Sequence, residues 1–451
     1  MLNIQSDSRK IKQGDTFVAV KCEVNDGHQY IEKAIENGAT KIVAERGEYS
    51  VPTLIVEDTR KYLEDYLKEN YNKYLDEMTI IGITGTNGKT TSAYLIYQAL
   101  NKLGIKTEYI GTIGFFLEEK VMNLPNTSVD ICDTYDLFMK AYDAGYKTVV
   151  METSSHALYN GRLKTINFDY GIFTNLTQDH LDYHITMDNY ALAKQIIFKS
   201  LKKGGVAIVN NDDEYKNYFL LEQNKNVTYG FTDSDYKIND IKMNSHGSTF
   251  KLNDLNIETK LIGRYNIYNL VDAIVLLKQM NINDEDIKKV VTELNPPAGR
   301  MDKIEYKTNS IIIDYAHTPD GLENFISTVK EFVEGNIYIV FGCTGDRDRL
   351  KRPIMTDIVG SYSKYFIITN DDPHFEDTTQ IVNDMTSKYK GDNYEVCLDR
   401  KQAIEKGINL LNENDVLLIL GKGHEEFMII GKDKIPFNDK KVVLDYLEEL
   451  S

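Results

Sequence analysis

The segment of this sequence best suited to binding a phosphate is a loop rich in glycine and threonine. The apolar run 80–84 predicts a strand, and the apolar spacing after Lys89 predicts a helix. In such a loop the backbone N–H groups at the helix start point at one place and attract an anion. Lys89 would add a full charge, and the Thr90 hydroxyl can reach a magnesium ion. The predicted nucleotide-binding residues of the loop are Gly85, Thr86, Asn87, Gly88, Lys89, Thr90 and Thr91.

The loop departs from the usual spacing of phosphate-binding loops. That pattern has a glycine five positions before the glycine that precedes the lysine, whereas Ile83 stands there, flanked by Gly82 and Gly85. A purely structural turn is the alternative interpretation, and the strand before and helix after the loop favour binding of a nucleoside triphosphate. The departure indicates that this is not the loop of an ordinary GTPase or kinase.

The elements that must hold this loop predict an α/β protein of several domains. At 451 residues, and with roughly 150 residues per domain, the chain should form about three. Strand patterns alternate with helical patterns, which predicts parallel sheets covered by helices. We expect an N-terminal α/β domain (1–78), a central domain with a P-loop-type parallel sheet and helices on both faces (79–299), and a C-terminal Rossmann-like domain (300–451). The segment 63–78 predicts a connecting helix.

Composition excludes several classes of function. The net charge is −17, which disfavours nonspecific binding to nucleic acid or to an anionic membrane. No run approaches the roughly 18 apolar residues that cross a bilayer, and the first residues lack the pattern of a secretory signal. The four cysteines have no paired metal-ligand or redox spacing. We therefore expect a cytoplasmic protein.

Several polar clusters follow predicted strands, where ligands bind in open α/β sheets. They are "METSSHAL" (151–158), "FTNLTQDHLDYH" (173–184), "GRYNIYN" (263–269), "AGRMD" (298–302), "IDYAHTPDG" (313–321), "FGCTGDRDRLKRP" (341–353), "NDDPHFED" (370–377) and "LGKGHEEF" (420–427). Their joint order, with the loop, resembles the Mur ligases of peptidoglycan synthesis, and within them the UDP-N-acetylmuramoyl-tripeptide synthetase class. The resemblance spans nearly the whole chain, from "SDSRKIKQGDTFVAV" to "IPFNDKK".

The resemblance implies an ATP-dependent amide ligase that uses magnesium. In this family a carboxylate of a UDP-sugar peptide attacks the γ-phosphate of ATP, and an amino acid then displaces phosphate from the acyl phosphate. The implied substrates are UDP-N-acetylmuramoyl-L-alanyl-D-glutamate and a free diamino acid, bound by a protein that is expected to be a monomer.

The resemblance assigns four residues to catalysis, which are Lys89, Glu152, His180 and Lys194, and it assigns Thr90, Glu152, His180 and carbamylated Lys194 to the metal. Glu152 ends a predicted buried strand, where a carboxylate needs a cation, although a solvated or ion-paired glutamate is the alternative. For His180 a hydrogen-bonded histidine is the alternative, because magnesium prefers oxygen.

Lys194 lies in a predicted helix whose apolar face contains Leu192, Ile196 and Ile197. An exposed lysine on the opposite face is therefore one interpretation. In the family the matching lysine carries a carbamate formed from carbon dioxide, which requires a depressed amine pKa.

Further matches concern ATP and the UDP-sugar peptide. Asn269 matches the residue that contacts adenine, and Arg300 and Asp314 match residues that bind ATP from the hinge and the third domain, although an inter-domain salt bridge could also explain Arg300. His317 is expected to support the same region. The matched UDP-sugar-peptide contacts are Ser8, Asn126, Thr127, Ser128, Ser154 and Arg162. Cys22 and Val129 depart from the family's common glycine and proline, so the shapes of these two loops are left open.

The amino-acid pocket of the family contains Asp-Asx-Pro-Arg when the substrate is meso-diaminopimelate. Here the sequence is Asp371-Asp372-Pro373-His374. Loss of the arginine and gain of Asp372 favour a substrate that ends in an ammonium group alone, so L-lysine is the preferred prediction and meso-diaminopimelate the next. The other matched residues of this pocket are Arg347, Gly421 and Glu425. The resemblance assigns Arg347 and Glu425 to the α-carboxylate and amine end of the amino acid, which either substrate has.

Two other interpretations remain. A folylpolyglutamate synthetase-like ligase would share the chemistry, but it would not be expected to contain the "DSR…GDTFVAV…DGH" N-terminal unit. A noncatalytic ATP-binding assembly subunit predicts damage to the metal and lysine positions. Lys89, Glu152, His180 and Lys194 are all present.

Overall fold

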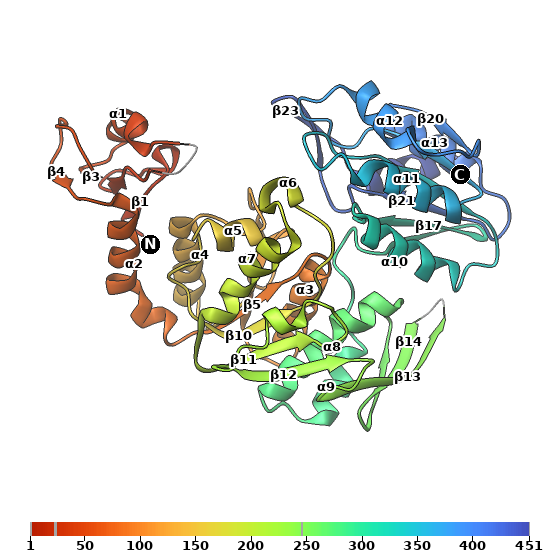
Figure 1. The fold of residues 1–451 in the computed structure, drawn as a ribbon, viewed down its shortest axis with the longest axis horizontal. Helices are drawn as coiled ribbons and strands as arrows, with labels where there is room; N and C mark the ends of the chain where they lie inside the picture. The colour runs from red at the N-terminus through yellow and green to blue at the C-terminus, as the bar shows by residue number, and fades with distance from the viewer. Residues whose placement is uncertain (1, 22–24, 245–246, 451) are drawn as a thin grey trace.

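The chain forms three successive α/β domains in a computed structural model that describes residues 2–21, 25–244 and 247–450. Cys22, one of the two departures from the family pattern, lies outside the described residues. Figure 1 shows the N-terminal domain at one side, the middle domain at the centre and the C-terminal domain at the other side. Within the described part of the chain, no helix is long and apolar enough to cross a membrane. The expected boundaries at 78/79 and 299/300 stay predictions.

The N-terminal domain contains a parallel four-stranded sheet in the order β1-β2-β3-β4. Its elements are β1 (Ile4–Gln5), β2 (Thr16–Val18), α1 (Ile31–Glu36), β3 (Lys41–Ala44) and β4 (Thr53–Ile55). The expected connecting helix is confirmed as α2 (Thr59–Leu75), and it begins where the Asp58 side chain accepts a hydrogen bond from the Lys61 N–H.

The middle domain is built on an eleven-stranded sheet in the order β15-β14-β13-β12-β11-β10-β5-β9-β6-β7-β8. Its parallel centre consists of β12 (Lys225–Gly230), β11 (Leu201–Asn210), β10 (Phe168–Phe173), β5 (Thr79–Thr84), β9 (Thr148–Glu152) and β6 (Thr107–Gly111). The sequence did not predict the additions at the two edges, which are β7 (Gly114–Phe116), β8 (Lys120–Met122), β13 (Tyr236–Asn244), β14 (Gly247–Leu252) and β15 (Leu255–Thr259). Of these, β13 joins β12 in parallel, and the other pairings are antiparallel.

Helices cover both faces of this sheet, as expected. One hydrophobic core contains side chains of α3 (Lys89–Lys102), α8 (Arg264–Gln279) and α9 (Asp284–Val291). The core on the opposite face contains side chains of α2, α4 (Ile131–Asp143) and α7 (Met187–Lys199). A sheet buried on both faces explains why its central strands are almost continuously apolar.

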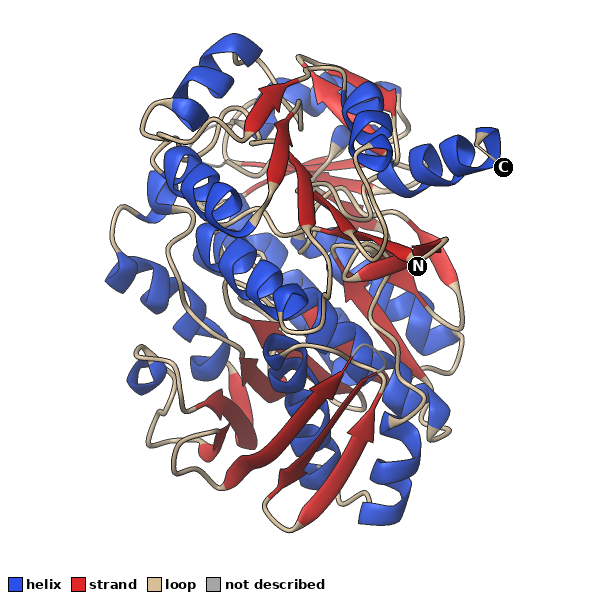
Figure 2. Cartoon of the chain, turned by 90° about the vertical axis from the view of Figure 1, so that its right-hand side faces the viewer, coloured by secondary structure: helices blue, strands red, loops and turns tan. Residues whose placement is uncertain are grey.

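The C-terminal domain has a six-stranded sheet in the order β16-β17-β21-β18-β19-β20, of which β16 is antiparallel. The strands are β16 (Asp302–Tyr306), β17 (Asn309–Asp314), β18 (Ile337–Phe341), β19 (Tyr365–Ile368), β20 (Tyr394–Val396) and β21 (Val416–Leu420). Helices α10 (Pro319–Lys330), α11 (Lys351–Tyr362) and α12 (Thr378–Thr386) pack on one face, and α13 (Arg400–Asn409) and α14 (Asp439–Glu449) pack on the other. The view in Figure 2 shows these strands enclosed by helices, which is the expected Rossmann-like arrangement.

A small hairpin, β22 (Phe427–Ile430) with β23 (Asp433–Pro436), follows β21. The remaining short helices of the middle domain are α5 (Ser155–Tyr159) and α6 (Leu181–His184), which follow β9 and β10. Residues after the carboxyl ends of strands in the middle and C-terminal domains line two shared cavities. The predicted site residues are therefore brought together from two domains.

Candidate active site

The phosphate loop connects β5 to α3, and two of its glycines are required by close packing. A Cβ atom on Gly85 would lie 1.9 Å from Thr174 Oγ1, and one on Gly88 would lie 2.4 Å from Asn269 Oδ1. Gly88 also has a φ of 86°, which glycine adopts readily. Ile83, the departure from the usual pattern, is a buried strand residue that pairs with Ile172 and Glu152. Strand β5 ends at Thr84, so the loop begins at Gly85, after this position.

Lys89 is bent back over its own loop. Its Nζ donates to the carbonyl oxygens of Gly85 at 2.9 Å and Thr86 at 2.8 Å. Burial lowers the pKa of Lys89, while Glu152 and Asp179 act in the opposite direction. A phosphate placed at the loop would supply a counter-charge that the carbonyl groups cannot.

Glu152 is fully buried at the end of β9 and collects hydrogen-bond donors. It accepts from the Thr90 hydroxyl at 2.9 Å, the Tyr109 hydroxyl at 2.5 Å and the Thr112 N–H at 2.8 Å. Its carboxylate and the Thr90 oxygen therefore lie side by side. Both residues line a cavity next to the phosphate loop. Two adjacent oxygen ligands of this kind fit the ligand preference of magnesium.

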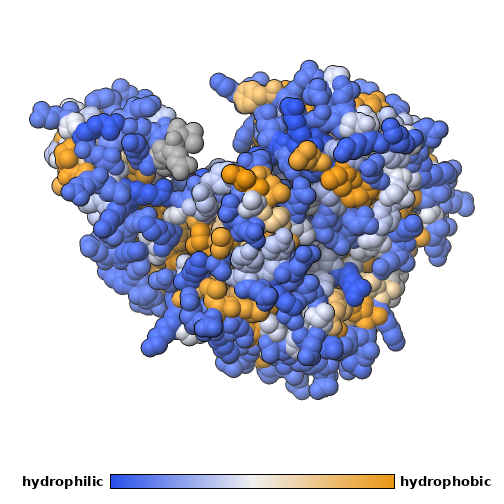
Figure 3. Space-filling model, viewed as in Figure 1, coloured by the Kyte–Doolittle hydropathy of each residue, from blue (hydrophilic) through white to orange (hydrophobic). Residues whose placement is uncertain are grey.

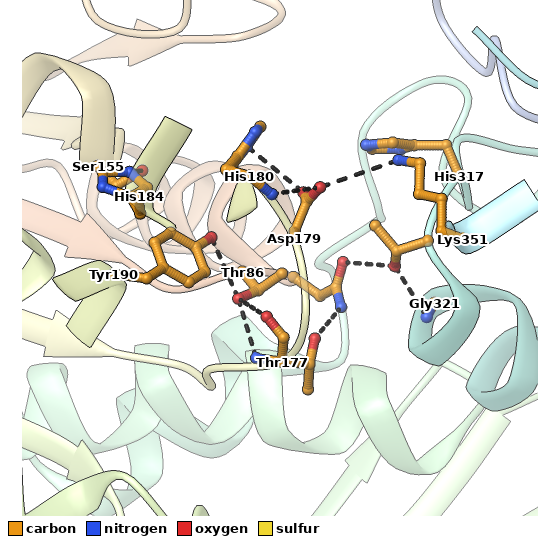
Figure 4. Close-up of polar contacts among 12 residues, drawn as sticks. Thr86, Ser155, Thr177, Asp179, His180, His184, Tyr190, His317, Gly321 and Lys351 are labelled. Carbon is orange, nitrogen blue, oxygen red and sulfur yellow. Dashed lines mark hydrogen bonds and ion pairs between the residues drawn. The ribbon is translucent and has the colours of Figure 1, made fainter. Parts of the chain in front are cut away.

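His180 and Asp179 form a second polar group beside the loop, shown in Figure 4. The His180 ring nitrogen lies 3.4 Å from Asp179 Oδ2, and His180 has a φ of 54° at the start of α6. Burial lowers the pKa of His180, although Asp179 opposes this. The imidazole is therefore neutral at physiological pH, with a nitrogen lone pair free to act as a ligand.

Lys194 is buried rather than exposed, so the exposed-lysine interpretation is wrong. Its Nζ donates to the Gly85 carbonyl at 2.7 Å and lies 4.4 Å from the centre of the Tyr190 ring. Leu192, which the sequence placed on the apolar face, is 44% exposed. Burial, and next the charge of Lys89, shift the pKa of Lys194 well below its ordinary value. A neutral amine is the form that reacts with carbon dioxide, and the carbamate itself stays a prediction.

A cavity of about 430 Å³, which we call the hinge cavity, lies where the middle domain meets the C-terminal domain. Among the residues that line it are Asn87, Gly88, Thr91, Asn269, Arg300, Asp314, His317 and Asp320. Arg300 lies 4.4 Å over the Tyr315 ring, and its buried Nε has no hydrogen-bond partner among the described residues. This arrangement argues against the alternative that Arg300 serves only as a salt bridge between domains. Asp314 accepts from the Met301 and Ala316 N–H groups, each at 2.8 Å.

The phosphate loop also contacts the C-terminal domain directly. The side-chain amide of Asn87 donates to Asp320 Oδ2 at 2.9 Å, and Asp320 belongs to the first turn of α10. Thr318, which caps this helix by accepting from the Gly321 N–H, also contacts the Asn87 side chain. The sequence assigned Asn87 to nucleotide binding and did not predict this bridge.

A second cavity of about 380 Å³, which we call the central cavity, joins the phosphate loop to the predicted amino-acid pocket. Its lining includes Thr86, Lys89, Thr90, Thr127, Glu152, Asp179, His180, Arg300, Arg347, Lys351, Asp371, Asp372, His374, Gly421 and Glu425. Most of the predicted catalytic and amino-acid-binding side chains thus face one space. Lys194 does not line this cavity, although its Nζ contacts the Gly85 carbonyl of the loop.

The acidic pocket of the C-terminal domain already contains a cation. The Lys422 Nζ lies 2.7 Å from Asp372 Oδ1 and 2.7 Å from Glu425 Oε2, and 4.0 Å from Asp371 Oδ1. Lys422 is completely buried. It therefore occupies the place that the sequence-based argument reserved for the ammonium group of a substrate. The motif "GKG" did not reveal this role because lysine is usually an exposed residue.

On the other side of the middle domain, Ser8 and Arg162 line a cavity of about 500 Å³ between it and the N-terminal domain. Ser128 donates to the Glu152 carbonyl at 2.9 Å and accepts from the Ser154 N–H at 2.9 Å. These contacts join the predicted substrate residues to β9. Asn126, by contrast, is exposed and lines none of the three cavities.

Comparison with known proteins matches three family models along the chain. They are "Mur ligase family, catalytic domain" at residues 2–82, "Mur ligase middle domain" at 83–277 and "Mur ligase, glutamate ligase domain" at 299–423. The chain belongs to the Mur ligase family. It is therefore an ATP-dependent amide ligase. Magnesium is the general cofactor of this family.

Its relatives agree over almost the full length. The chain is 41% identical to "UDP-N-acetylmuramoyl-L-alanyl-D-glutamate--2,6-diaminopimelate ligase" of Clostridium perfringens, covering 99% of this chain and 95% of that one. It is 39% identical to the ligase of the same name from Bacillus cereus, covering 98% and 92%. A solved structure of that name has a TM-score of 0.68 at 30% identity, covering 99% and 95%. MurF from Thermotoga maritima in complex with ADP shares the fold, with a TM-score of 0.72, 19% identity and coverage of 100% and 98%.

Proposed function

We propose that this Mur ligase adds meso-diaminopimelate to UDP-N-acetylmuramoyl-L-alanyl-D-glutamate. A carboxylate oxygen of the UDP-sugar peptide attacks the γ-phosphorus of ATP, and the bond to the ADP oxygen breaks. The amine of the amino acid then attacks the acyl carbon, loses a proton and expels phosphate. The observation that carries this proposal is the central cavity, which joins Lys89 and Glu152 to Arg347 and Glu425.

The chain's own residues suit these steps. The phosphate loop and Lys89 would hold the ATP phosphates, while Asn269 and Asp314 in the hinge cavity would hold the nucleoside. Thr90, Glu152, His180 and carbamylated Lys194 are the residues that we assign to magnesium. When bound, magnesium would screen the phosphate charge. Arg300 lines both cavities and so could reach ATP from either one.

The UDP-sugar peptide would extend from the N-terminal domain to the central cavity. Ser8 and Arg162 are assigned to its nucleotide-sugar part, and Thr127, Ser128 and Ser154 to the part near Glu152. For Asn126, only the match to the family supports a role in substrate binding. Figure 3 shows an open notch between the N-terminal and C-terminal domains, through which a long substrate can reach the middle domain.

Two features favour meso-diaminopimelate over L-lysine, the preferred prediction from sequence, which is not confirmed. First, both compared relatives are named as diaminopimelate ligases. Second, Lys422 neutralises part of the acidic pocket, and among the described residues Arg347 has no ion-pair partner. Lys422 thus weakens the charge argument for a bare ammonium group, whereas Arg347 is matched to the α-carboxylate, which both substrates carry. His374, at the position of the family arginine, lines the same cavity.

The proposal is tested by mass analysis of the product formed from ATP, UDP-N-acetylmuramoyl-dipeptide and each amino acid offered alone. We expect ligation of meso-diaminopimelate and little with L-lysine. The reverse result would restore the lysine assignment. Turnover with folates would support a folylpolyglutamate synthetase-like ligase, and ATP binding without ligation would support a noncatalytic subunit. Light scattering of the same sample tests whether the enzyme is a monomer.

A further inference from the structure

The buried cations of the C-terminal domain differ in how they are neutralised. Arg352, Arg400 and Lys422 each have a carboxylate oxygen within 2.8 Å. Lys351, whose side chain is only 11% exposed, has Asp179 as its nearest carboxylate, at 3.9 Å. A buried charge requires a close partner. The charge of Lys351 is therefore only partly neutralised, and the ammonium group can bind a further anion.

Asp179 is itself largely engaged elsewhere. Its Oδ1 accepts from the His180 N–H at 3.0 Å, and its Oδ2 faces the His180 ring at 3.4 Å. Figure 4 shows Lys351 reaching from the C-terminal domain toward Asp179 across the space between the domains. The loose 3.9 Å contact therefore leaves most of the ammonium group facing the central cavity.

The position of Lys351 identifies the kind of anion. It lines the central cavity together with Lys89 of the middle domain, and Asp179 lies near both ammonium groups. Its charge also acts on His317, whose pKa falls to about 4 chiefly because of burial and next because of Lys351. The Asp371, Asp372 and Glu425 cluster has its own cation in Lys422. Lys351 thus faces the phosphate side of the cavity rather than the amino-acid pocket.

We propose that Lys351 is a further catalytic residue that binds the phosphoryl group during its transfer. This inference rests on the proposed function. As the carboxylate oxygen bonds to phosphorus and the bond to ADP breaks, negative charge is spread over the phosphoryl oxygens. Lys89 contacts that group from the loop, and Lys351 contacts it from the opposite domain. The reaction then requires the C-terminal domain to be in place before transfer.

The test compares Lys351→Met, Lys351→Gln and Lys351→Arg with the control Lys401→Met, since Lys401 is an exposed lysine on α13 with a 3.6 Å contact to Glu405. Removing a group that stabilises transferred charge lowers kcat by about 10²-fold, with KM for the amino acid changed less than about threefold. We expect Lys351→Arg to retain part of kcat and the melting temperatures to stay close to that of the parent.

A second readout needs no ligation. Calorimetry measures the affinity for a nonhydrolysable ATP analogue and for ADP. The ratio of these two affinities should be larger for the parent than for Lys351→Met. Unchanged kcat and unchanged discrimination in folded Lys351→Met or Lys351→Gln would overturn the inference. A fall in melting temperature with equal effects on all substrates would do so as well. If the parent ligates no diaminopimelate, the proposed function fails, and the nucleotide comparison still decides the role of Lys351.

Discussion

Lys422 and Asp372 form a buried ion pair 2.7 Å long at the centre of the acidic pocket. The same ammonium group contacts Glu425, whose pKa is raised to about 7 by burial, with Lys422 opposing that shift. Three carboxylates therefore share one internal cation. The pocket is less negative than its sequence suggests, and its shape depends on a residue that does not line the cavity.

Replacing Lys422 by methionine tests this dependence. Leaving buried carboxylates without their cation should lower the free energy of unfolding by about 3–5 kcal/mol, and KM for the amino acid should rise because Asp372 and Glu425 repel each other. Urea denaturation and steady-state kinetics measure the two effects. Lys440→Met removes an exposed partner of Asp302 and should cost at most about 1 kcal/mol. Equal losses in the two variants would contradict the prediction.

Replacing Lys89 by alanine should nearly abolish turnover. The charge of the β- and γ-phosphates would be unbalanced during transfer, which lowers kcat by at least about 10²-fold. Phosphate release in the presence of both substrates is the measurement. Lys102→Ala, which removes an exposed lysine at the other end of α3, is the matched control and should leave the rate unchanged. Full activity in Lys89→Ala would exclude the phosphate loop from the mechanism.

The buried amine of Lys194 predicts that activity depends on dissolved carbon dioxide. Removing carbon dioxide should lower kcat of the parent enzyme, and adding bicarbonate should restore it. Carbon-13 NMR after addition of labelled bicarbonate should show a carbamate signal in the parent and none in Lys194→Met. A parent enzyme that is fully active without carbon dioxide and gives no signal would show that Lys194 acts as a plain amine.

Glu108 makes stability depend on pH. It is completely buried on β6, both carboxyl oxygens lack hydrogen-bond partners within the described part of the chain, and burial raises its pKa well above the ordinary value. The folded protein therefore keeps a proton that the unfolded chain releases above its own pKa of about 4.3. The associated stability is present below that pH and is lost as pH rises, by up to about 1.4 kcal/mol per unit.

The variant Glu108→Met should consequently gain stability over the parent as pH increases from 5 to 8. Urea denaturation at both pH values measures the difference, and Glu119→Met, at an exposed position, serves as control. A Glu108→Met difference that is the same at pH 5 and pH 8 would contradict the shifted carboxyl.

The sequence predicted those parts of the site whose chemistry is local. Strand, glycine loop and helix are adjacent in sequence, so Lys89 and Thr90 were placed correctly beside β5. Glu152 was singled out because a carboxylate at the end of an apolar strand needs a cation, but only the resemblance assigned it to the metal, and that role stays a prediction. The three-domain α/β fold followed from the alternation of strand and helix patterns.

Contacts between distant segments could not be predicted in this way. The apolar pattern of α7 suggested that Lys194 is exposed, because a pattern of apolar residues does not reveal a polar neighbour such as the Gly85 carbonyl. Lys422 and Lys351 were missed for the same reason, since their roles depend on residues far away in the chain. The edge strands β13–β15 were missed because their sequences are mixed and polar.

Because Asn87 is a proposed nucleotide ligand, we expect its hydrogen bond to Asp320 to link nucleotide affinity to the orientation of the C-terminal domain. A rotation of that domain that broke this bond would release the phosphate loop from Asp320. By thermodynamic reciprocity, a bound nucleotide shifts the orientation by the same free energy. A small molecule that separates Asn87 from Asp320 in the hinge cavity would therefore disturb nucleotide binding and domain orientation together.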